Sequence, residues 1–98
     1  MYILINSSDA PSLEDADNFR EFSIVEQNGG QTPEALGDVA VPAEDNHFWL
    51  DANAVIELSN RNEDQSWVDA FWEMLEKVQA YGYSNMTTQQ VKAHVVRK

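Results

Sequence analysis

The clearest pattern of hydrophobic and polar positions lies in the third quarter of the chain. Apolar residues recur there every three or four positions, as on the buried face of an α-helix, at Trp67, Val68, Phe71, Trp72, Leu75 and Val78. Ser66 and Asp69 have the spacing of a capping box, which opens a helix, and Gly82 stands where a helix often ends. The pattern predicts one long amphipathic helix over about residues 66–81.

Four other segments have the composition of strands. They are rich in β-branched and aromatic residues and are bounded by turn-forming residues; they cover residues 2–5, 19–26, 39–41 and 47–50. Pro42 ends the third of them and polar residues follow, so the third and fourth segments are expected to form a hairpin over 38–50. The polar stretches between strands, residues 7–18 and 28–37, are expected to be surface loops.

Two further segments fit either a helix or a strand. Asp51 can cap a short helix near 52–59, although alternate residues in 52–60 are also apolar, as on a strand. The helix is the favoured interpretation there. Thr87 and Gln90 have the spacing of a capping box that could open a helix over 88–97, yet the valines and alanine of this segment alternate with polar residues, so a final strand is favoured.

These elements together predict the fold class. A long helix among several short strands indicates an α+β domain, in which a small antiparallel sheet carries the long helix packed across one face. A chain of 98 residues has the length of one domain. We therefore treat residues 1–98 as a single domain.

The charge of the chain is strongly negative and unevenly distributed. Six basic residues stand against seventeen acidic ones, which gives a net charge of −11. All the acids lie in the first 76 residues, whose net charge is −15, whereas the last 22 residues carry +4. An acidic body repels nucleic acid and anionic membranes at long range. We therefore expect no direct nucleic-acid binding, and a partner that is a basic protein or a second copy of this chain.

Composition also bears on the compartment. The chain has no cysteine, which is typical of proteins in a reducing environment. No apolar run approaches the roughly 20 residues that a membrane-spanning helix needs, and the first residues lack the basic segment of a signal peptide. The sequence predicts a soluble cytoplasmic protein with no membrane partner.

Few residues are candidates for catalysis or metal binding. His47 and His94 are the only histidines, and each is a possible general acid or base because histidine titrates near neutral pH. Neither belongs to a known catalytic motif. Asp69, Glu73 and Glu76 share a helical face, but solvated charges on an amphipathic helix explain them. We therefore expect no metal and no cofactor.

The density of aromatic residues has two explanations. The apolar stripe of the long helix is wider than one small sheet must cover, so either the core is rich in aromatic residues, which is the favoured interpretation, or part of the stripe is exposed. If part of it is exposed, its edge, Trp67 and Phe71, is expected to form a binding surface with Trp49 and Tyr83.

The favoured function is that of a small acidic intracellular protein that binds another protein, as an inhibitor, an immunity-type protein or an accessory subunit. An enzyme is not favoured. The first alternative is a small α+β enzyme or ligand-binding domain with a histidine in an aromatic pocket. The second is a nucleic-acid mimic, in which carboxylates take the place of phosphates.

Overall fold

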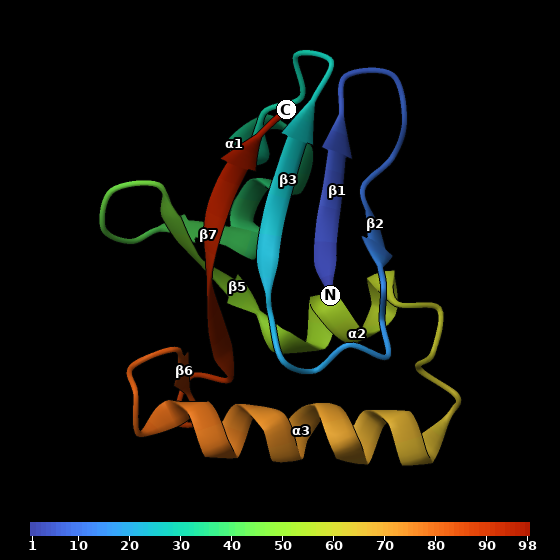
Figure 1. Cartoon of the computed structure of the whole chain (residues 1–98), viewed down its shortest axis with the longest axis vertical. Helices are drawn as coiled ribbons and strands as arrows, with labels where there is room; N and C mark the ends of the chain where they lie inside the picture. The colour runs from blue at the N-terminus through green and yellow to red at the C-terminus, as the bar shows by residue number, and fades with distance from the viewer.

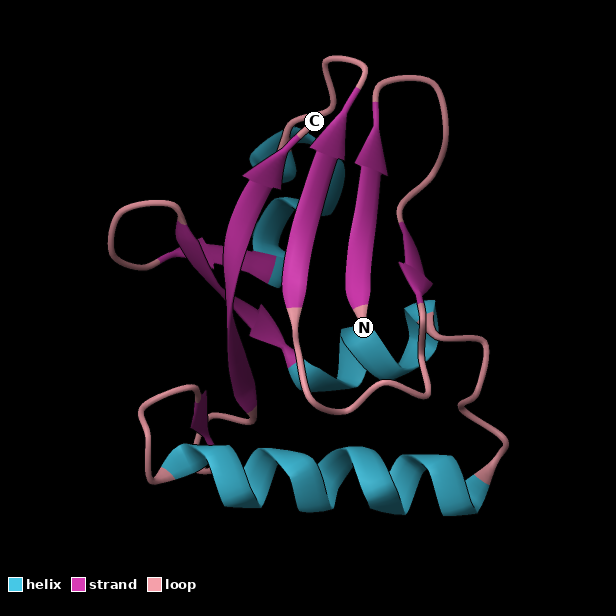
Figure 2. Cartoon of the chain, viewed as in Figure 1, coloured by secondary structure: helices cyan, strands magenta, loops and turns pink.

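A computed structural model describes residues 1–98 and shows a twisted sheet with helices behind it and below it (Figures 1 and 2). The sheet has the strand order β2-β1-β3-β7-β5-β4, with the short β6 paired to β7. The strands are β1 Tyr2–Asn6, β2 Ser12–Glu14, β3 Ser23–Gln27, β4 Ala40–Pro42, β5 His47–Asp51, β6 Ser84–Asn85 and β7 Gln90–Arg97. The helices are α1 Thr32–Leu36, a 3-10 turn Gly37–Val39, α2 Ala52–Leu58 and α3 Gln65–Gln79.

The α+β class is confirmed, and so are both interpretations of the ambiguous segments. Residues 52–58 form the short helix α2, and the Asp51 side chain accepts a hydrogen bond from the Asn53 N–H at its start. Residues 90–97 form the strand β7. The expected hairpin is present as the antiparallel pair of β4 and β5.

The sheet is mixed, however, and not wholly antiparallel as expected. β3 lies between β1 and β7 and runs parallel to both. A parallel pair needs a long connection, and the chain supplies one in each case: 7–22 between β1 and β3, and all of α1 to β6 between β3 and β7. The period-2 pattern of a strand carries no information on the direction of its neighbour, so the sequence pattern did not reveal this.

Other differences concern the segments expected to be loops. Residues 12–14 form the edge strand β2, which pairs with β1. Residues 32–36 form α1, with Pro33 in its first turn, where the missing N–H costs nothing. β3 begins at Ser23 and not at residue 19, so Phe19 and Phe22 belong to the loop before it.

The long helix α3 occupies residues 65–79, close to the expected bounds. Its cap is Asp64, whose carboxylate accepts hydrogen bonds from the Trp67 N–H at 3.2 Å and the Ser66 hydroxyl at 2.8 Å. Ser66 is therefore inside the helix and is not its N-cap. α3 lies crosswise to β1 and β3 at the end of the sheet where those strands begin (Figure 1).

The two faces of the sheet have different surroundings. α1 and α2 lie behind the sheet (Figure 1), and the side chains on that core face are buried. They join residues of α2 and α3 in one apolar cluster that includes Ile3, Ile5, Ile24, Leu50, Val55, Phe71, Leu75 and Val91. No helix covers the strands β1, β3 and β7 on the side toward the viewer (Figure 2).

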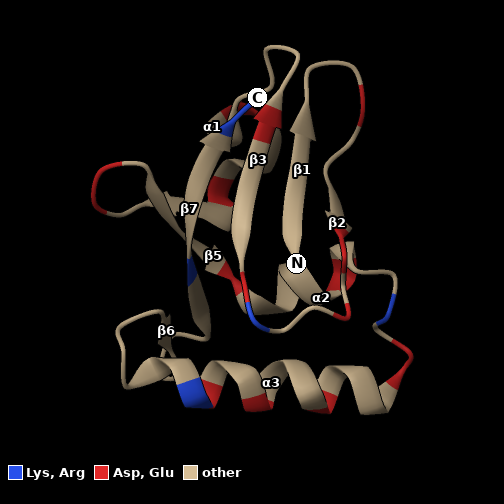
Figure 3. Ribbon diagram, viewed as in Figure 1, with Lys and Arg blue, Asp and Glu red and all other residues tan.

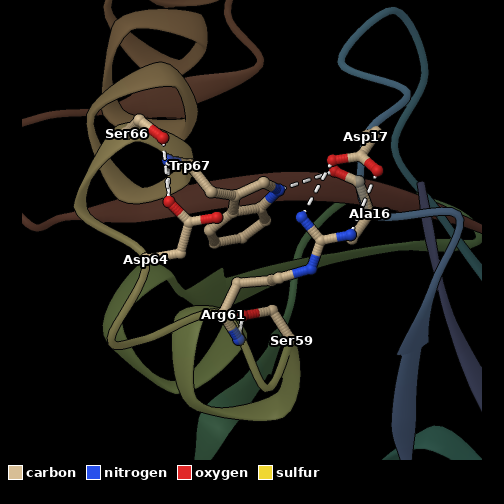
Figure 4. A network of polar contacts seen from close by, with 7 residues as sticks. All are labelled: Ala16, Asp17, Ser59, Arg61, Asp64, Ser66 and Trp67. Carbon is tan, nitrogen blue, oxygen red and sulfur yellow. Dashed lines mark hydrogen bonds and ion pairs between the residues drawn. The ribbon is translucent and has the colours of Figure 1, made fainter.

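A polar network holds the loop before β3 against the start of α3 (Figure 4). The Trp67 indole N–H donates to the Ala16 carbonyl oxygen at 2.8 Å. The Arg61 guanidinium donates to both carboxylate oxygens of Asp17, each at 3.0 Å, and this partner raises the pKa of Arg61. The loop therefore has a defined position, and it places residues 19–22 beside the uncovered side of the sheet.

None of the helices has the length and apolar character needed to cross a bilayer.

Candidate functional site

The uncovered side of the sheet, here called the open face, carries every second residue of its strands. Because side chains alternate across a strand, burying Ile3, Ile24 and Val91 on the core face turns their neighbours outward. In β1, β3, β7 and β5, the open face consists of Tyr2, Leu4, Ser23, Val25, Gln27, Lys92, His94, Val96, His47 and Trp49.

A groove of about 670 Å³ runs over the open face. Its floor is formed by alternate residues of β3 and β7. Its walls come from three other parts of the chain: the loop residues Phe19 and Phe22, Met74 and Val78 of α3, and Tyr83 before β6. A smaller hollow of about 310 Å³ continues from it along α3 and shares Phe19, Met74 and Val78. The apolar lining is therefore concentrated at the α3 end of the groove.

The groove is a positively charged region on a negatively charged protein. Three of the six basic residues line it, Arg20, Lys92 and Lys98, together with one acid, Glu21. With neutral histidine the lining residues carry +2, or +1 when Glu44, the ion-pair partner of Lys92, is included, against −11 for the whole chain. Figure 3 shows basic segments at the tip of β7, in the lower half of β7 and below β3, while acidic segments recur along α3, at the tip of β3 and in the peripheral loops.

The ion pairs of the protein leave two of these cations without a partner. Arg61 pairs with Asp17, Lys77 with Glu73, Lys92 with Glu44 and Arg97 with Glu26. The side chains of Arg20 and Lys98 form no ion pair, although the chain has an excess of carboxylates. Both of them line the groove.

Lys92 contacts an acid, an aromatic ring and the residue that precedes β6. Its ammonium group forms an ion pair with Glu44, whose pKa is lowered by the hydrogen bond from Lys92, and lies 5.1 Å from the centre of the Trp49 ring. Its backbone N–H donates to the Tyr83 carbonyl oxygen at 2.8 Å. Trp49 and Tyr83, two of the residues expected to form a binding surface, are thus each neighbours of Lys92; Tyr83 is 53% exposed and lines the groove, whereas Trp49 does not line it.

The other two expected surface residues are in the core. Trp67 is 4% exposed and Phe71 is fully buried, so neither lies on a surface that a partner can reach. Their rings stack with centres 5.4 Å apart, and the loop residue Phe19 packs on Trp67 at 6.0 Å. The loop before β3 covers the edge of the helical stripe, which the sequence left without a packing partner.

The two histidines face each other across adjacent strands. His47 and His94 are register partners of β5 and β7, and their ring centres are 6.2 Å apart. His47 Nδ1 lies 2.7 Å from the Asp45 carbonyl oxygen, and His94 lines the groove beside Ser23, its partner in β3. No hydrogen bond joins Ser23 to His94, and no carboxylate contacts either ring, so a serine–histidine–acid arrangement is not assembled.

Several lining residues were not recognised in the sequence. Arg20, Ser23 and Lys98 come together only because β3 and β7 are neighbours, and these strands are far apart in the chain. The alternation of β7 does place Lys92, His94 and Val96 on one side, and this was the one available signal for a functional face. No group of three or more potential ligands from His, Cys, Asp and Glu is arranged to hold a metal ion.

Comparison with known proteins gives no family for this chain. No family model matches it, and neither a curated protein nor a solved structure matches it. The groove is therefore the feature that bears on function, and it has a half-apolar floor, aromatic walls and two basic side chains without partners.

Proposed function

We propose that this protein is a binding module without catalytic activity, which holds a segment of a partner protein in the groove on its open face. The observation that carries the proposal is the uncovered sheet face itself. It presents half-buried apolar and aromatic side chains such as Leu4, Val96 and Trp49 where a second layer would normally cover them. Exposed apolar surface bordered by polar groups is typical of interaction sites.

The distribution of side chains in the groove supports a protein partner. Apolar residues are concentrated at the α3 end and in the valines of the floor, and charged residues border them at both ends of the groove, as apolar and polar parts adjoin in a protein interface. Tyr83 and Trp49 are of the aromatic type that often anchors partners, and they lie beside Lys92. The net charge of the chain predicted a basic partner. Because the groove itself is cationic, we propose a partner whose contact surface is compatible with the positive charge of the groove.

A small-molecule binding site is the second candidate. A volume of about 670 Å³ is within the usual range for ligand pockets, and His94 and Ser23 supply polar groups at its floor. Because no carboxylate orients either histidine, the site fits ligand binding better than catalysis.

The nucleic-acid mimic draws no support from the groove, whose excess charge is positive. The cytoplasmic location stays a prediction of the sequence.

The experiment that tests the proposal compares two equal substitutions on valines of the sheet. Val96 is half-buried and lines the groove, whereas Val41 is 46% exposed on the edge strand β4 and does not line it. Tagged wild-type protein, Val96→Gln and Val41→Gln are used to isolate bound proteins, which are identified by mass spectrometry. We expect a partner that is retained by wild type and Val41→Gln and is depleted several-fold with Val96→Gln. Equal recovery with all three folded proteins would place the interaction elsewhere.

A further inference from the structure

The unpaired cations of the groove carry information about the partner. In a chain with seventeen carboxylates and six basic residues, most basic side chains find an acid, and four of them do. Arg20 and Lys98 do not, and both line the groove. Their position argues for a contact with an anionic group that the chain itself does not supply.

The spacing of the cations indicates an extended ligand. Lys92 and Lys98 are six residues apart along β7 and its continuation, which corresponds to about 20 Å at the rise of a strand. Arg20 precedes β3 at one end, while the Lys98 N–H donates to the Glu26 carbonyl oxygen at the other end. A single small anion cannot reach both ends, whereas about six residues of extended peptide can.

The surface between the cations alternates between polar and apolar side chains, with Ser23, Gln27 and His94 among the valines. Val25 of β3 and Val96 of β7 are register partners on the floor of the groove, and Tyr2 of β1 lies beside them as the neighbour of Ser23. A ligand that satisfies this arrangement has carboxylates near its ends and apolar side chains between them.

We propose that the groove binds an extended acidic segment of a partner protein, whose carboxylates contact Arg20 and Lys98 and whose apolar side chains pack on Tyr2 and Val96. This inference rests on the function proposed above and specifies the chemistry of the partner. The body of the protein remains negative, so it repels a dense polyanion at long range. A nucleic acid is therefore a poorer occupant than a peptide with few, separated carboxylates.

The experiment uses synthetic peptides as probes of the intact chain. The acidic probe is a fluorescein-labelled peptide of about eight residues with glutamates at both ends and alternating valine and threonine between them. Its neutral counterpart has glutamine in place of glutamate, and a single-stranded oligonucleotide of similar length serves as the polyanion. Fluorescence anisotropy measures binding at low salt and at about 0.5 M salt, where charge screening is strong.

Three variants locate the binding energy. Arg20→Gln and Lys98→Gln each remove one cation from the groove, while Lys77→Gln removes the same charge from α3, where Lys77 pairs with Glu73 and lines only the smaller hollow. We expect the acidic peptide to bind at least tenfold more tightly than the neutral one at low salt. Each groove variant is expected to weaken binding about twofold to fivefold, as for exposed charge pairs, and Lys77→Gln to have a smaller effect.

The contrary outcomes separate this inference from the proposed function. Equal binding of the acidic and neutral peptides overturns the charge argument, and so does an equal loss with Lys77→Gln. Tighter binding of the oligonucleotide overturns the choice of a peptide. In each of these cases a partner that is lost with Val96→Gln still supports the groove as the interaction site, whereas retention of the partner by Val96→Gln contradicts the proposed function.

Discussion

The two faces of the sheet differ in burial and in polarity. On the core face, Ile3, Ile24 and Leu50 are fully buried, and the helices α1 and α2 lie over them (Figure 1). On the open face, the adjacent residues Leu4 and Trp49 are only half-buried, and charged and imidazole groups lie among them. The core face therefore accounts for most of the stability, and the open face is available for recognition.

The largest expected effect tests this comparison within a single strand. Ile3 and Leu4 are adjacent in β1 and have side chains of the same size, but they point to opposite faces. Ile3→Ala is expected to lower the free energy of unfolding by about 2–5 kcal/mol, because it removes buried methyl groups and leaves a cavity. Leu4→Ala is expected to lower it by about 1 kcal/mol, since most of the lost contacts are replaced by water. Chemical denaturation followed by tryptophan fluorescence measures both.

Similar losses of unfolding free energy for the two variants would contradict this difference between the faces. They would mean that the open face is packed as tightly as the core, for example by self-association. Repeating the measurement at several protein concentrations separates these cases, because only an oligomer gains stability with concentration.

A second test concerns the backbone where the chain leaves β3 and passes behind the sheet to α1. Gly30 is buried there, and a Cβ at this position would lie 2.5 Å from the Ile5 carbonyl oxygen. Gly30→Ala is expected to cost about 3 kcal/mol, because two backbone segments must move apart. At Gly29 a Cβ meets no atom within 4 Å, and only the positive φ of 79° opposes it. Gly29→Ala is therefore the matched control and should cost about 1 kcal/mol. Thermal unfolding that ranks Gly29→Ala as the more harmful would contradict this packing.

The elements with strong local patterns were predictable from the sequence. The 3.6-residue period identified α3, and Pro42 with the polar residues after it identified the hairpin of β4 and β5. The alternation of Val91, Ala93 and Val95 identified β7. These signals are local, because each depends on residues that are close in the chain.

The groove was not predictable in the same way. It depends on the parallel neighbours β3 and β7, which are joined by most of the chain, and their pairing is set by tertiary packing. The error at Trp67 and Phe71 has a related cause. The width of the helical stripe was correctly recognised, but the loop that covers it, with Ala16 and Phe19, is distant in sequence and has no helical or strand period.

The smallest expected effects come from two carboxylates whose pKa values are lowered. One, Asp64, caps α3 away from the groove, and the other, Glu44, lies beside the groove. The pKa of Asp64 at the start of α3 is lowered mainly by the hydrogen bond from the Ser66 hydroxyl, with a further contribution from the Trp67 N–H. The pKa of Glu44 is lowered by the hydrogen bond and charge of Lys92 beside the groove. A carboxylate with a lowered pKa stabilises the folded state above its ordinary pKa near 4 and loses this contribution as the pH falls through the folded value.

Replacing each carboxylate with its amide should therefore have consequences that differ between the two regions. Asp64→Asn and Glu44→Gln are each expected to lower the Tm slightly at pH 6, with the difference from wild type disappearing toward pH 2. Their effects on binding should differ, because only Glu44 competes with a ligand carboxylate for Lys92. Glu44→Gln is expected to strengthen binding of the acidic peptide about twofold to fivefold at low salt, while Asp64→Asn leaves it unchanged. If both variants strengthened binding equally, the change would reflect net charge alone, and the open face would hold no special position for an acidic segment.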